Sequence, residues 1–239
     1  MSEAVELLQR MGSPSRATQR EACDEALARL RVEPGLRDGV RELLRADNAL
    51  ARFSAAWVLF QIERPTLRLL PALLDALELP DGDLRWQAAQ MLAALGRLQT
   101  EVLPVLLHDA GSAASASRRR MAIFVLRELA PERAETGALY LRALDDADGD
   151  VRRAALSCFA KLTDPDRSLA LRALALARGA DPDPRMARIA AVVLPELARF
   201  HPDLRAEFDT ALALLERAAD ASLARGAQAA RKRLADTDE

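Results

Sequence analysis

The sequence contains very little cysteine and lysine, and the shortage of cysteine excludes two kinds of site. Cys23 and Cys158 are its only cysteines and stand far apart, so the chain has neither a disulfide framework nor a CxxC metal motif. Lys161 and Lys232 are its only lysines, so arginine supplies nearly all of the positive charge. This preference for arginine, together with abundant alanine, indicates a GC-rich source genome.

The sequence also lacks an excess of charge of one sign and a long hydrophobic run. Its formal net charge is −2 with 29% charged residues, so there is no broad basic field to hold nucleic acid or an anionic membrane. No apolar run approaches the length that spans a bilayer, and the opening segment MSEAVELLQRMG lacks the profile of a signal peptide. We therefore expect a reduced, cytoplasmic protein without a membrane partner.

The motifs of well-known enzyme and metal sites are absent as well. The sequence has no glycine-rich phosphate loop, GxSxG elbow, HExxH motif or cluster of paired carboxylates. The segment DDADGD fails as an EF-hand loop, because its first and last ligand positions fall on Leu144 and Ala155. His108 and His201, the only histidines, are far apart and near predicted helix ends, which favours solvated or capping roles. No catalytic residue, metal site or cofactor is predicted.

What the sequence does contain is an internal repeat. In DGDVRRAALSCFAKL, Arg152 is followed by Ala155 at +3, Phe159 at +7 and Leu162 at +10, offsets that lie on one face of a helix. The template recurs from anchors 32, 33, 34, 33, 35 and 37 residues apart, at Arg20, Arg52, Arg85, Arg119, Arg152, Ala187 and Ala224. Apolar segments such as 67–77, 101–110, 136–144 and 167–177 precede these helices across short polar turns, and no strand pattern occurs. The repeating unit is therefore predicted to be helix–turn–helix.

On these features the chain resembles the HEAT-repeat family of HEAT-like or armadillo-type helical repeats, and in particular its bacterial members. The residues that carry the resemblance are the Asp-rich turns, VR at 151–152, LR at 84–85, the alanine at +3, and Pro71 and Pro104 in first helices. The resemblance implies an all-α fold, a right-handed α-α superhelix (solenoid) of about seven repeats in a single domain, 1–239. The repeats are expected at approximately 2–32, 34–63, 65–97, 100–131, 133–164, 166–200 and 202–236, the last as a polar cap.

The row of anchor arginines has a structural explanation. In the HEAT-repeat family this arginine usually binds an aspartate of a repeat turn, so the resemblance implies a ladder of ion pairs between neighbouring units. The expected partners are Asp47, Asp81, Asp83, Asp148 and Asp150.

The aromatic residues suggest a binding surface. Five of the nine aromatics occupy offsets of the second helices that lie opposite the packed face: Phe53, Trp57, Phe60, Trp86 and Phe124. In ARFSAAWVLF, Ala55 and Leu59 already supply the core positions. In the HEAT-repeat family the second helices line the concave surface, where large aromatics beside arginine form recognition hot spots. The alternative is that the rings only fill the seam between neighbouring second helices.

The leading functional prediction is a monomeric, non-catalytic scaffold that binds a protein or peptide on its concave face. We expect the partner to be partly apolar and locally acidic. The predicted binding residues are the five aromatics with Arg97, Arg120, Arg127, Arg153 and Arg188.

The alternative is a HEAT-like DNA-binding enzyme of the alkylpurine DNA glycosylase type, which uses tryptophans, an acid and arginines in a concave cleft. Here the outward positions near the tryptophans supply no carboxylate, and Glu21 and Glu25 are expected to form only an acidic border. The small net charge also disfavours nucleic acid. HEAT-like phycobilin lyases are a further enzymatic precedent, without a specific residue match.

Overall fold

A computed structural model describes residues 3–236, and their regular elements are all helices. The α-helices are α1 (Glu3–Arg10), α2 (Arg16–Arg29), α3 (Pro34–Leu43), α4 (Ala49–Ile62), α5 (Leu70–Ala76), α6 (Gly82–Leu98), α7 (Val102–Ser112), α8 (Ala116–Leu129), α9 (Ala134–Ala143), α10 (Gly149–Cys158), α11 (Arg167–Ala177), α12 (Pro184–Ala198), α13 (Arg205–Leu215) and α14 (Ala221–Asp236). Short 3₁₀ helices are η1 (Leu67–Leu69), η2 (Phe159–Lys161) and η3 (Pro202–Leu204). The predicted all-α fold of about seven helix–turn–helix repeats is confirmed.

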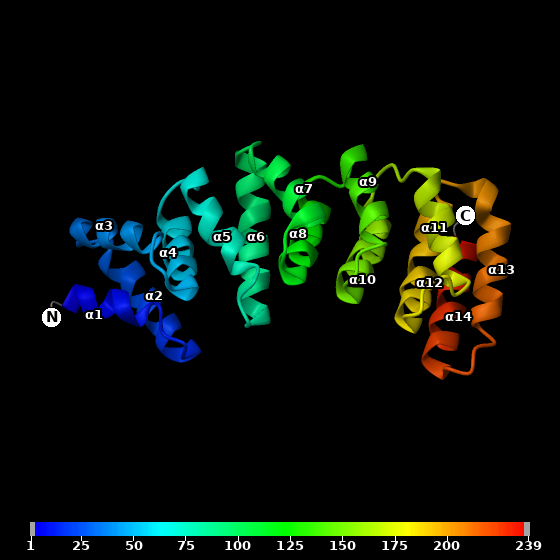
Figure 1. Ribbon diagram of the computed structural model, residues 1–239, viewed down its shortest axis with the longest axis horizontal. Coiled ribbons are helices and arrows are strands. Elements are labelled where there is room, and N and C mark those ends of the chain that lie inside the picture. The colour runs from blue at the N-terminus through cyan, green and yellow to red at the C-terminus, as the bar shows by residue number, and fades with distance from the viewer. Residues whose placement is uncertain (1–2, 237–239) are drawn as a thin grey trace. The chain divides into compact units, whose positions relative to one another are not determined.

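The helices follow one another as seven pairs, each with a first and a second helix (Figure 1). Every second helix begins after a residue whose side-chain oxygen accepts a hydrogen bond from a backbone N–H of the first turn. These N-caps are 33, 33, 34, 33, 35 and 37 residues apart, at Ser15, Asn48, Asp81, Ser115, Asp148, Asp183 and Asp220. They fix a common register, in which position +5 is the fifth residue after the N-cap.

The N-caps correct the predicted register of the first repeat. In four of the next pairs an arginine occupies position +4, at Arg52, Arg85, Arg119 and Arg152. In α2, position +4 is Gln19, and the predicted anchor Arg20 stands at +5. Ala22 and Ala26, both fully buried, therefore occupy the first two core positions of α2. The sequence pattern was misread here because Cys23, Leu27 and Leu30 repeat the same offsets one residue later.

The chain divides into two compact units, residues 1–105 and 106–239, called unit 1 and unit 2 below. The boundary falls inside α7, and each unit is described by itself. A single domain over 1–239 stays a prediction. Its two ends, 1–2 and 237–239, and the predicted start of the first repeat at residue 2, lie outside the described residues.

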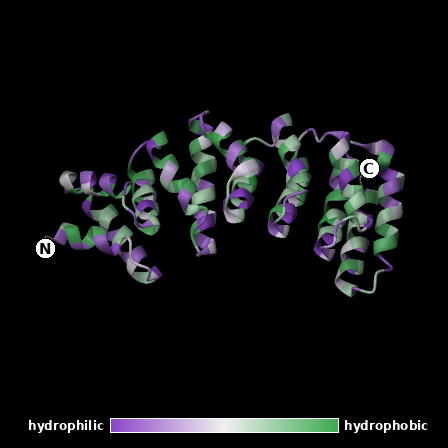
Figure 2. Cartoon of the chain, viewed as in Figure 1, coloured by the Kyte–Doolittle hydropathy of each residue, from purple (hydrophilic) through white to green (hydrophobic). Residues whose placement is uncertain are grey.

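Within each unit the core follows the repeat template. Apolar residues face the neighbouring helices, and polar residues dominate the turns (Figure 2). Ala55 and Leu59 are buried as predicted, and the same holds for Ala155 in α10 and for Phe159 at the start of η2. The last pair departs from the template, because Arg231 takes an apolar position and binds carboxylates of α13 instead. In unit 2, α8, α10, α12 and α14 pack side by side in that order.

Among the described residues, none of the helices is long and apolar enough to cross a membrane.

Candidate partner-binding site

The second helices share a face formed by positions +5 and +9, and its residues differ between the units. In unit 1, α2, α4 and α6 place Arg20, Phe53 and Trp86 at +5, and Asp24, Trp57 and Gln90 at +9. In unit 2, position +5 is arginine in every second helix: Arg120, Arg153, Arg188 and Arg225. Unit 1 therefore carries the tryptophans, and unit 2 carries a row of arginines.

The predicted aromatic residues of unit 1 are not equally exposed. Trp86 is 41% exposed, and Trp57 and Phe60 are half-buried. Phe53 is only 2% exposed, so the expectation that it faces outward is wrong. The cause is that α2 packs directly against α4, and a ring at +5 of α4 is covered in the seam between them. Both alternatives for the aromatics thus occur: Phe53 fills the seam, while Trp86 is accessible.

Unit 1 contains a half-open cleft of about 290 Å³ between α2 and α4. One face of α2 forms one wall, α4 forms the other, and α6 contributes a single glutamine. The lining residues are Arg16, Gln19, Arg20, Cys23, Asp24, Phe53, Ser54, Trp57 and Gln87. The cleft therefore combines two arginines, a carboxylate and amide groups with a half-buried tryptophan.

The floor of this cleft is held by a buried polar network. Gln19 and Ser54 are almost completely buried, and the Gln19 Nε2 donates to Ser54 Oγ at 2.8 Å. The Ser54 hydroxyl in turn donates to the backbone oxygen of Met11 at 2.7 Å. Because buried polar groups are costly unless hydrogen-bonded, this chain of bonds fixes α2 against α4 in one arrangement.

The two arginines of the cleft have different surroundings. Arg16 donates through Nη1 to Gln19 Oε1 at 2.9 Å, and its Nε lies 3.6 Å from a carboxylate oxygen of Asp81. Arg20 is exposed, and it makes neither a hydrogen bond nor an ion pair with any other residue that the structure describes. Asp24 completes the charges of the lining. Sequence reasoning missed Arg16, Arg20 and Asp24 because the register of the first repeat was shifted by one residue.

Neither cysteine is set up as a nucleophile. Burial raises the pKa of the Cys23 thiol, which lies at the wall of the cleft. In unit 2, burial raises the pKa of Cys158 to about 12, and it also raises the pKa of the buried Tyr140. Both thiols are therefore protonated near neutral pH, whereas nucleophilic cysteines need a lowered pKa.

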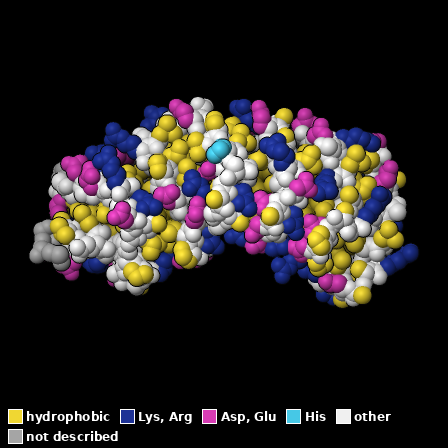
Figure 3. Space-filling model, viewed as in Figure 1, with side chains coloured by type: hydrophobic (Ala, Val, Ile, Leu, Met, Phe, Trp, Pro, Cys, Tyr) yellow, Lys and Arg dark blue, Asp and Glu magenta, His cyan; other side chains and the backbone are white. Residues whose placement is uncertain are grey.

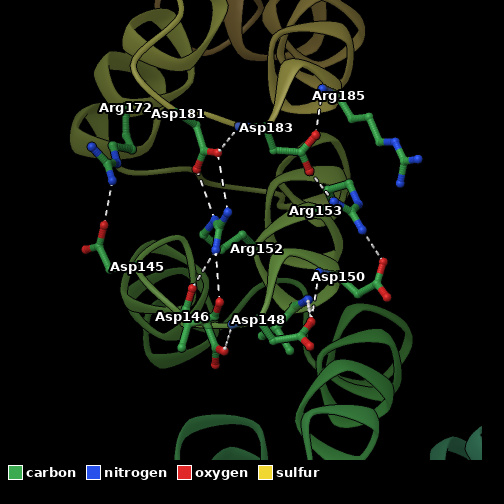
Figure 4. A network of polar contacts seen from close by, with 12 residues as sticks. Asp145, Asp146, Asp148, Asp150, Arg152, Arg153, Arg172, Asp181, Asp183 and Arg185 are labelled. Carbon is green, nitrogen blue, oxygen red and sulfur yellow. Dashed lines mark hydrogen bonds and ion pairs between the residues drawn. The ribbon is translucent and has the colours of Figure 1, made fainter.

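The arginines at +4 form the predicted ladder, with partners other than those expected. In unit 2, Arg119 binds both carboxylate oxygens of Asp146, at 2.7 and 2.8 Å. Arg152 binds Asp181 at 3.0 Å, as Figure 4 shows. In unit 1, Arg52 binds Asp75 at 2.9 Å. Each of these arginines also donates to backbone oxygens of its own turn, as does Arg85.

The aspartates that were expected as partners have other roles. Asp81 and Asp148 are N-caps, and Asp47 offers a backbone oxygen to Arg52. The ladder carboxylate is supplied by the following repeat, from the first helix or the turn after it. Sequence spacing could not identify it, because turn length differs between repeats.

A second ladder runs through position +5 of unit 2. Arg153 binds Asp150 and Asp183, as Figure 4 shows. Arg120 lies 3.5 Å from Asp150, and Arg188 binds Asp220 at 2.9 Å. Asp150 stands at +2 of α10, where it pairs with Arg153 of the same helix and with Arg120 of α8, and Asp183 and Asp220 are the N-caps of the second helices that follow Arg153 and Arg188. The predicted binding residues Arg120, Arg153 and Arg188 are thus neutralised by carboxylates of the same unit.

The other predicted residues lie at higher positions of the second helices. The guanidinium of Arg127 lies 5.4 Å from the ring centre of the half-buried Phe124, a cation–π contact within α8. Arg127 also lies 2.8 Å from Glu128. Arg97 is exposed near the end of α6 in unit 1.

The charged side chains on the face drawn in Figure 3 are of both signs, and the two histidines lie apart from each other in the sequence. Positive and negative side chains alternate over the face seen in Figure 3, without a continuous field of one sign. Within 3–236 there is no group of three or more histidine, cysteine or acidic side chains that could hold a metal ion. His108 is exposed, and the ring of His201 lies 2.8 Å from the backbone oxygen of Pro165.

Comparison with known proteins identifies the repeats. Residues 4–93 match a family model described as HEAT repeats. The X-ray structure of YIBA_ECOLI is 16% identical, with a TM-score of 0.56, over 98% of this chain and 93% of that chain. An engineered protein, target OR497, is 17% identical, with a TM-score of 0.51, over 97% of this chain and 68% of that chain. The designed armadillo repeat protein YIII(Dq)4CqI is 16% identical, with a TM-score of 0.48, over 97% of this chain and 100% of that chain.

No curated protein matches the sequence. The match to HEAT repeats covers residues 4–93, and over nearly its whole length the chain shares the fold of the YIBA_ECOLI structure. At these identities the likeness to solved structures concerns the fold alone.

Proposed function

We propose that this HEAT-repeat chain is a non-catalytic module that binds a protein or peptide partner on the exposed face of its second helices. The observation that carries the proposal is the cleft of unit 1, which combines Trp57 with two arginines above a rigid polar floor. Trp86, on the next second helix, is 41% exposed. Tryptophan and arginine are enriched among the few residues that carry most of the binding energy of protein interfaces.

The proposed contact residues are fewer than the sequence suggested. Trp57, Phe60 and Trp86 contribute in unit 1, and Phe124 with Arg127 contributes in unit 2. Arg97 remains a candidate at the edge of the set. Phe53 serves packing, since it is buried, and the three ladder arginines at +5 of unit 2 serve the ladder, since a partner carboxylate would have to displace their aspartates.

The proposal is tested by capture from a lysate of the source cell. Immobilised wild type is compared with Trp86→Ala and with Leu98→Ala, which removes another exposed apolar side chain, 48% exposed, from the same helix. We expect at least one protein that wild type and Leu98→Ala retain equally and that Trp86→Ala loses by fivefold or more. Equal retention by all three chains would refute the role of this face.

A second candidate function is a DNA-binding enzyme of the alkylpurine DNA glycosylase type, and one observation favours it. Asp24 lines the cleft with Trp57, Arg16 and Arg20, so an acid does accompany a tryptophan and two arginines. The charge argues against it, because Asp24 and Asp81 offset the two arginines and leave no basic field for a phosphate backbone. Titration of a fluorescent short DNA duplex across a salt series decides: absence of binding at low salt removes this candidate.

We further infer that the protein acts as a cytoplasmic monomer. Both cysteines are free and buried, which suits a reducing compartment, and the last helix pair is polar, which disfavours end-to-end growth. Light scattering coupled to size-exclusion chromatography should give the mass of one chain, 26.1 kDa.

A further inference from the structure

We propose that the cleft of unit 1 binds a single carboxylate side chain of the protein partner, with Arg20 as its ion-pair partner and Trp57 beside its apolar neighbour. The inference rests on the proposed function and narrows the chemistry of the partner. It predicts an aspartate or glutamate adjacent to an apolar residue, in an extended or helical segment that can enter a cleft of about 290 Å³.

The argument begins with the ladder at position +5. In unit 2 the three +5 arginines that are followed by another second helix, Arg120, Arg153 and Arg188, each pair with a carboxylate at its N-cap or at +2: Asp150, Asp183 or Asp220. Arg20 occupies the same position in α2, but the next second helix, α4, has Asn48 as its N-cap and Leu50 at +2. Neither residue carries a charge. Arg20 is therefore an arginine at the +5 ladder position that has no ion pair with an acid among residues 3–236.

The neighbours of Arg20 favour the same chemistry. Arg16 already donates to Gln19 and lies near Asp81, so Arg20 is the cation of the lining that has no partner among the described residues. The Gln19 amide is engaged with Ser54 and Arg16, which leaves Gln87 as a further polar group of the lining. A carboxylate that enters the cleft would meet the exposed Arg20 guanidinium, with which it can form charge-assisted hydrogen bonds.

The negative charges of the cleft limit the ligand to one acidic group. Asp24 lines the same wall as Arg20, and Asp81 lies beside Arg16. A run of phosphates or carboxylates would meet these acids, whereas a single carboxylate can pair with Arg20 and leave them solvated. The half-buried ring of Trp57 offers contact to an apolar neighbour of that acid. A protein segment supplies both groups in adjacent residues.

The experiment uses the two tryptophans of the chain, Trp57 and Trp86, whose indole N–H groups give two resolved signals in a ¹⁵N–¹H spectrum. The Trp57→Phe variant assigns them. The full-length protein is titrated with Ac-Gly-Glu-Leu-Gly-NH₂ and with the matched neutral peptide Ac-Gly-Gln-Leu-Gly-NH₂. We expect a saturable shift of the Trp57 signal by the glutamate peptide, and a Kd about fivefold weaker for the glutamine peptide, the effect of one partly screened ion pair.

Two variants place the effect at Arg20. Arg20→Gln should lower the affinity for the glutamate peptide to that for the glutamine peptide. The fold should be unchanged, because the Arg20 side chain has no hydrogen bond or ion pair with any residue in the described part of the chain. Arg225→Gln is the matched control, since Arg225 stands at +5 of α14, is exposed and also has no ion pair among the described residues. It should leave the affinity as in wild type.

Several results would overturn the proposal. The first is equal affinity for the two peptides. The second is that Arg20→Gln keeps the affinity for the glutamate peptide, or that Arg225→Gln loses as much affinity as Arg20→Gln. The third is that the Trp57 signal does not shift up to about 10 mM peptide, where even millimolar binding is visible. Inorganic phosphate that binds as well as the glutamate peptide would indicate a general anion site instead. If the peptide titration fails but a partner is still captured from the lysate in a Trp86-dependent way, the carboxylate site is wrong and the proposed function stands.

Discussion

Asp146→Asn is expected to destabilise unit 2, because it removes the charge from the best-formed pair of the ladder. Arg119 donates from Nε and Nη2 to the two oxygens of Asp146, at 2.7 and 2.8 Å, and the side chains are only 16% and 13% exposed. Asp146 Oδ1 also accepts the backbone N–H of Asp148 at 2.8 Å, a bond that asparagine can keep. The substitution therefore changes the ion pair and spares the turn.

The expected loss is about 2 kcal/mol of unfolding free energy at pH 7, the usual range for a charge-assisted hydrogen bond that is removed from a mostly buried site. The pH dependence has a definite sign. The hydrogen bonds from Arg119, more than any other cause, lower the pKa of Asp146 below its ordinary value. Such a group stabilises the fold above its unfolded pKa of about 3.9 and loses this contribution as the pH falls through the folded pKa. The difference between wild type and Asp146→Asn should therefore shrink in acid.

Urea unfolding followed by far-ultraviolet circular dichroism measures this loss, at pH 7 and at about pH 3. Asp145→Asn is the control, since Asp145 is the adjacent residue and pairs with Arg172, but its side chain is 74% exposed. That change should cost less than about 0.5 kcal/mol. Both tryptophans lie in unit 1, so tryptophan fluorescence reports the unfolding of unit 1 separately. The urea midpoint from fluorescence should therefore shift less than the midpoint from circular dichroism.

The reasoning is refuted if Asp146→Asn costs no more than Asp145→Asn at pH 7. It is also refuted if the cost at pH 3 is as large as at pH 7, because the effect would then not arise from the charge of Asp146.

Two further predictions concern burial. Phe53→Ala should lower the unfolding free energy of unit 1 by about 3 to 4 kcal/mol, as for a buried ring, whereas Trp86→Ala should cost less than about 1 kcal/mol. Urea unfolding followed by dichroism compares them, and equal costs would contradict the burial assigned to either ring. Cys158, whose pKa is raised to about 12 by burial, should resist a thiol-reactive disulfide reagent in the folded protein, while Cys23, 7% exposed, reacts first. With the Cys23→Ser variant, the reagent should release almost none of its coloured thiolate until urea is added. Rapid release from the reagent would show that Cys158 is accessible.

The fold could be predicted from the sequence because its signal is repeated. The offsets of Ala155, Phe159 and Leu162 recur in almost every second helix, so an error in one repeat is outweighed by the others. The N-caps were foreseeable in kind, since Asp, Asn and Ser before an apolar period are typical helix starts. The partners of the ladder arginines could not be predicted, because they depend on where the next repeat lies in space.

The site was harder to predict because it depends on a single repeat. The predicted register of α2 was off by one residue. It placed Arg20 at the +4 ladder position, which Gln19 occupies in the structure, and it placed Glu25 on the face formed by +5 and +9, where the structure has Asp24. Phe53 was misjudged for a different reason. Its offset points away from the core of its own pair, yet the neighbouring helix α2 covers it, and contacts between repeats do not follow from one helix's periodicity.

The ladder at +5 implies that one residue of the next helix decides whether an arginine stabilises the fold or is left for a partner. Leu50, at +2 of α4, stands where Asp150 stands in α10, within reach of a +5 arginine of the preceding second helix. Leu50→Asp should therefore supply Arg20 with a carboxylate. The affinity for the glutamate peptide should then fall by about fivefold, to the affinity for the glutamine peptide. Leu50→Asn is the matched control, because it has the same shape without the charge and should leave the affinity nearly unchanged. If both variants reduce the affinity equally, the loss comes from the missing leucine, and the charge of Arg20 is not what the cleft offers to its partner.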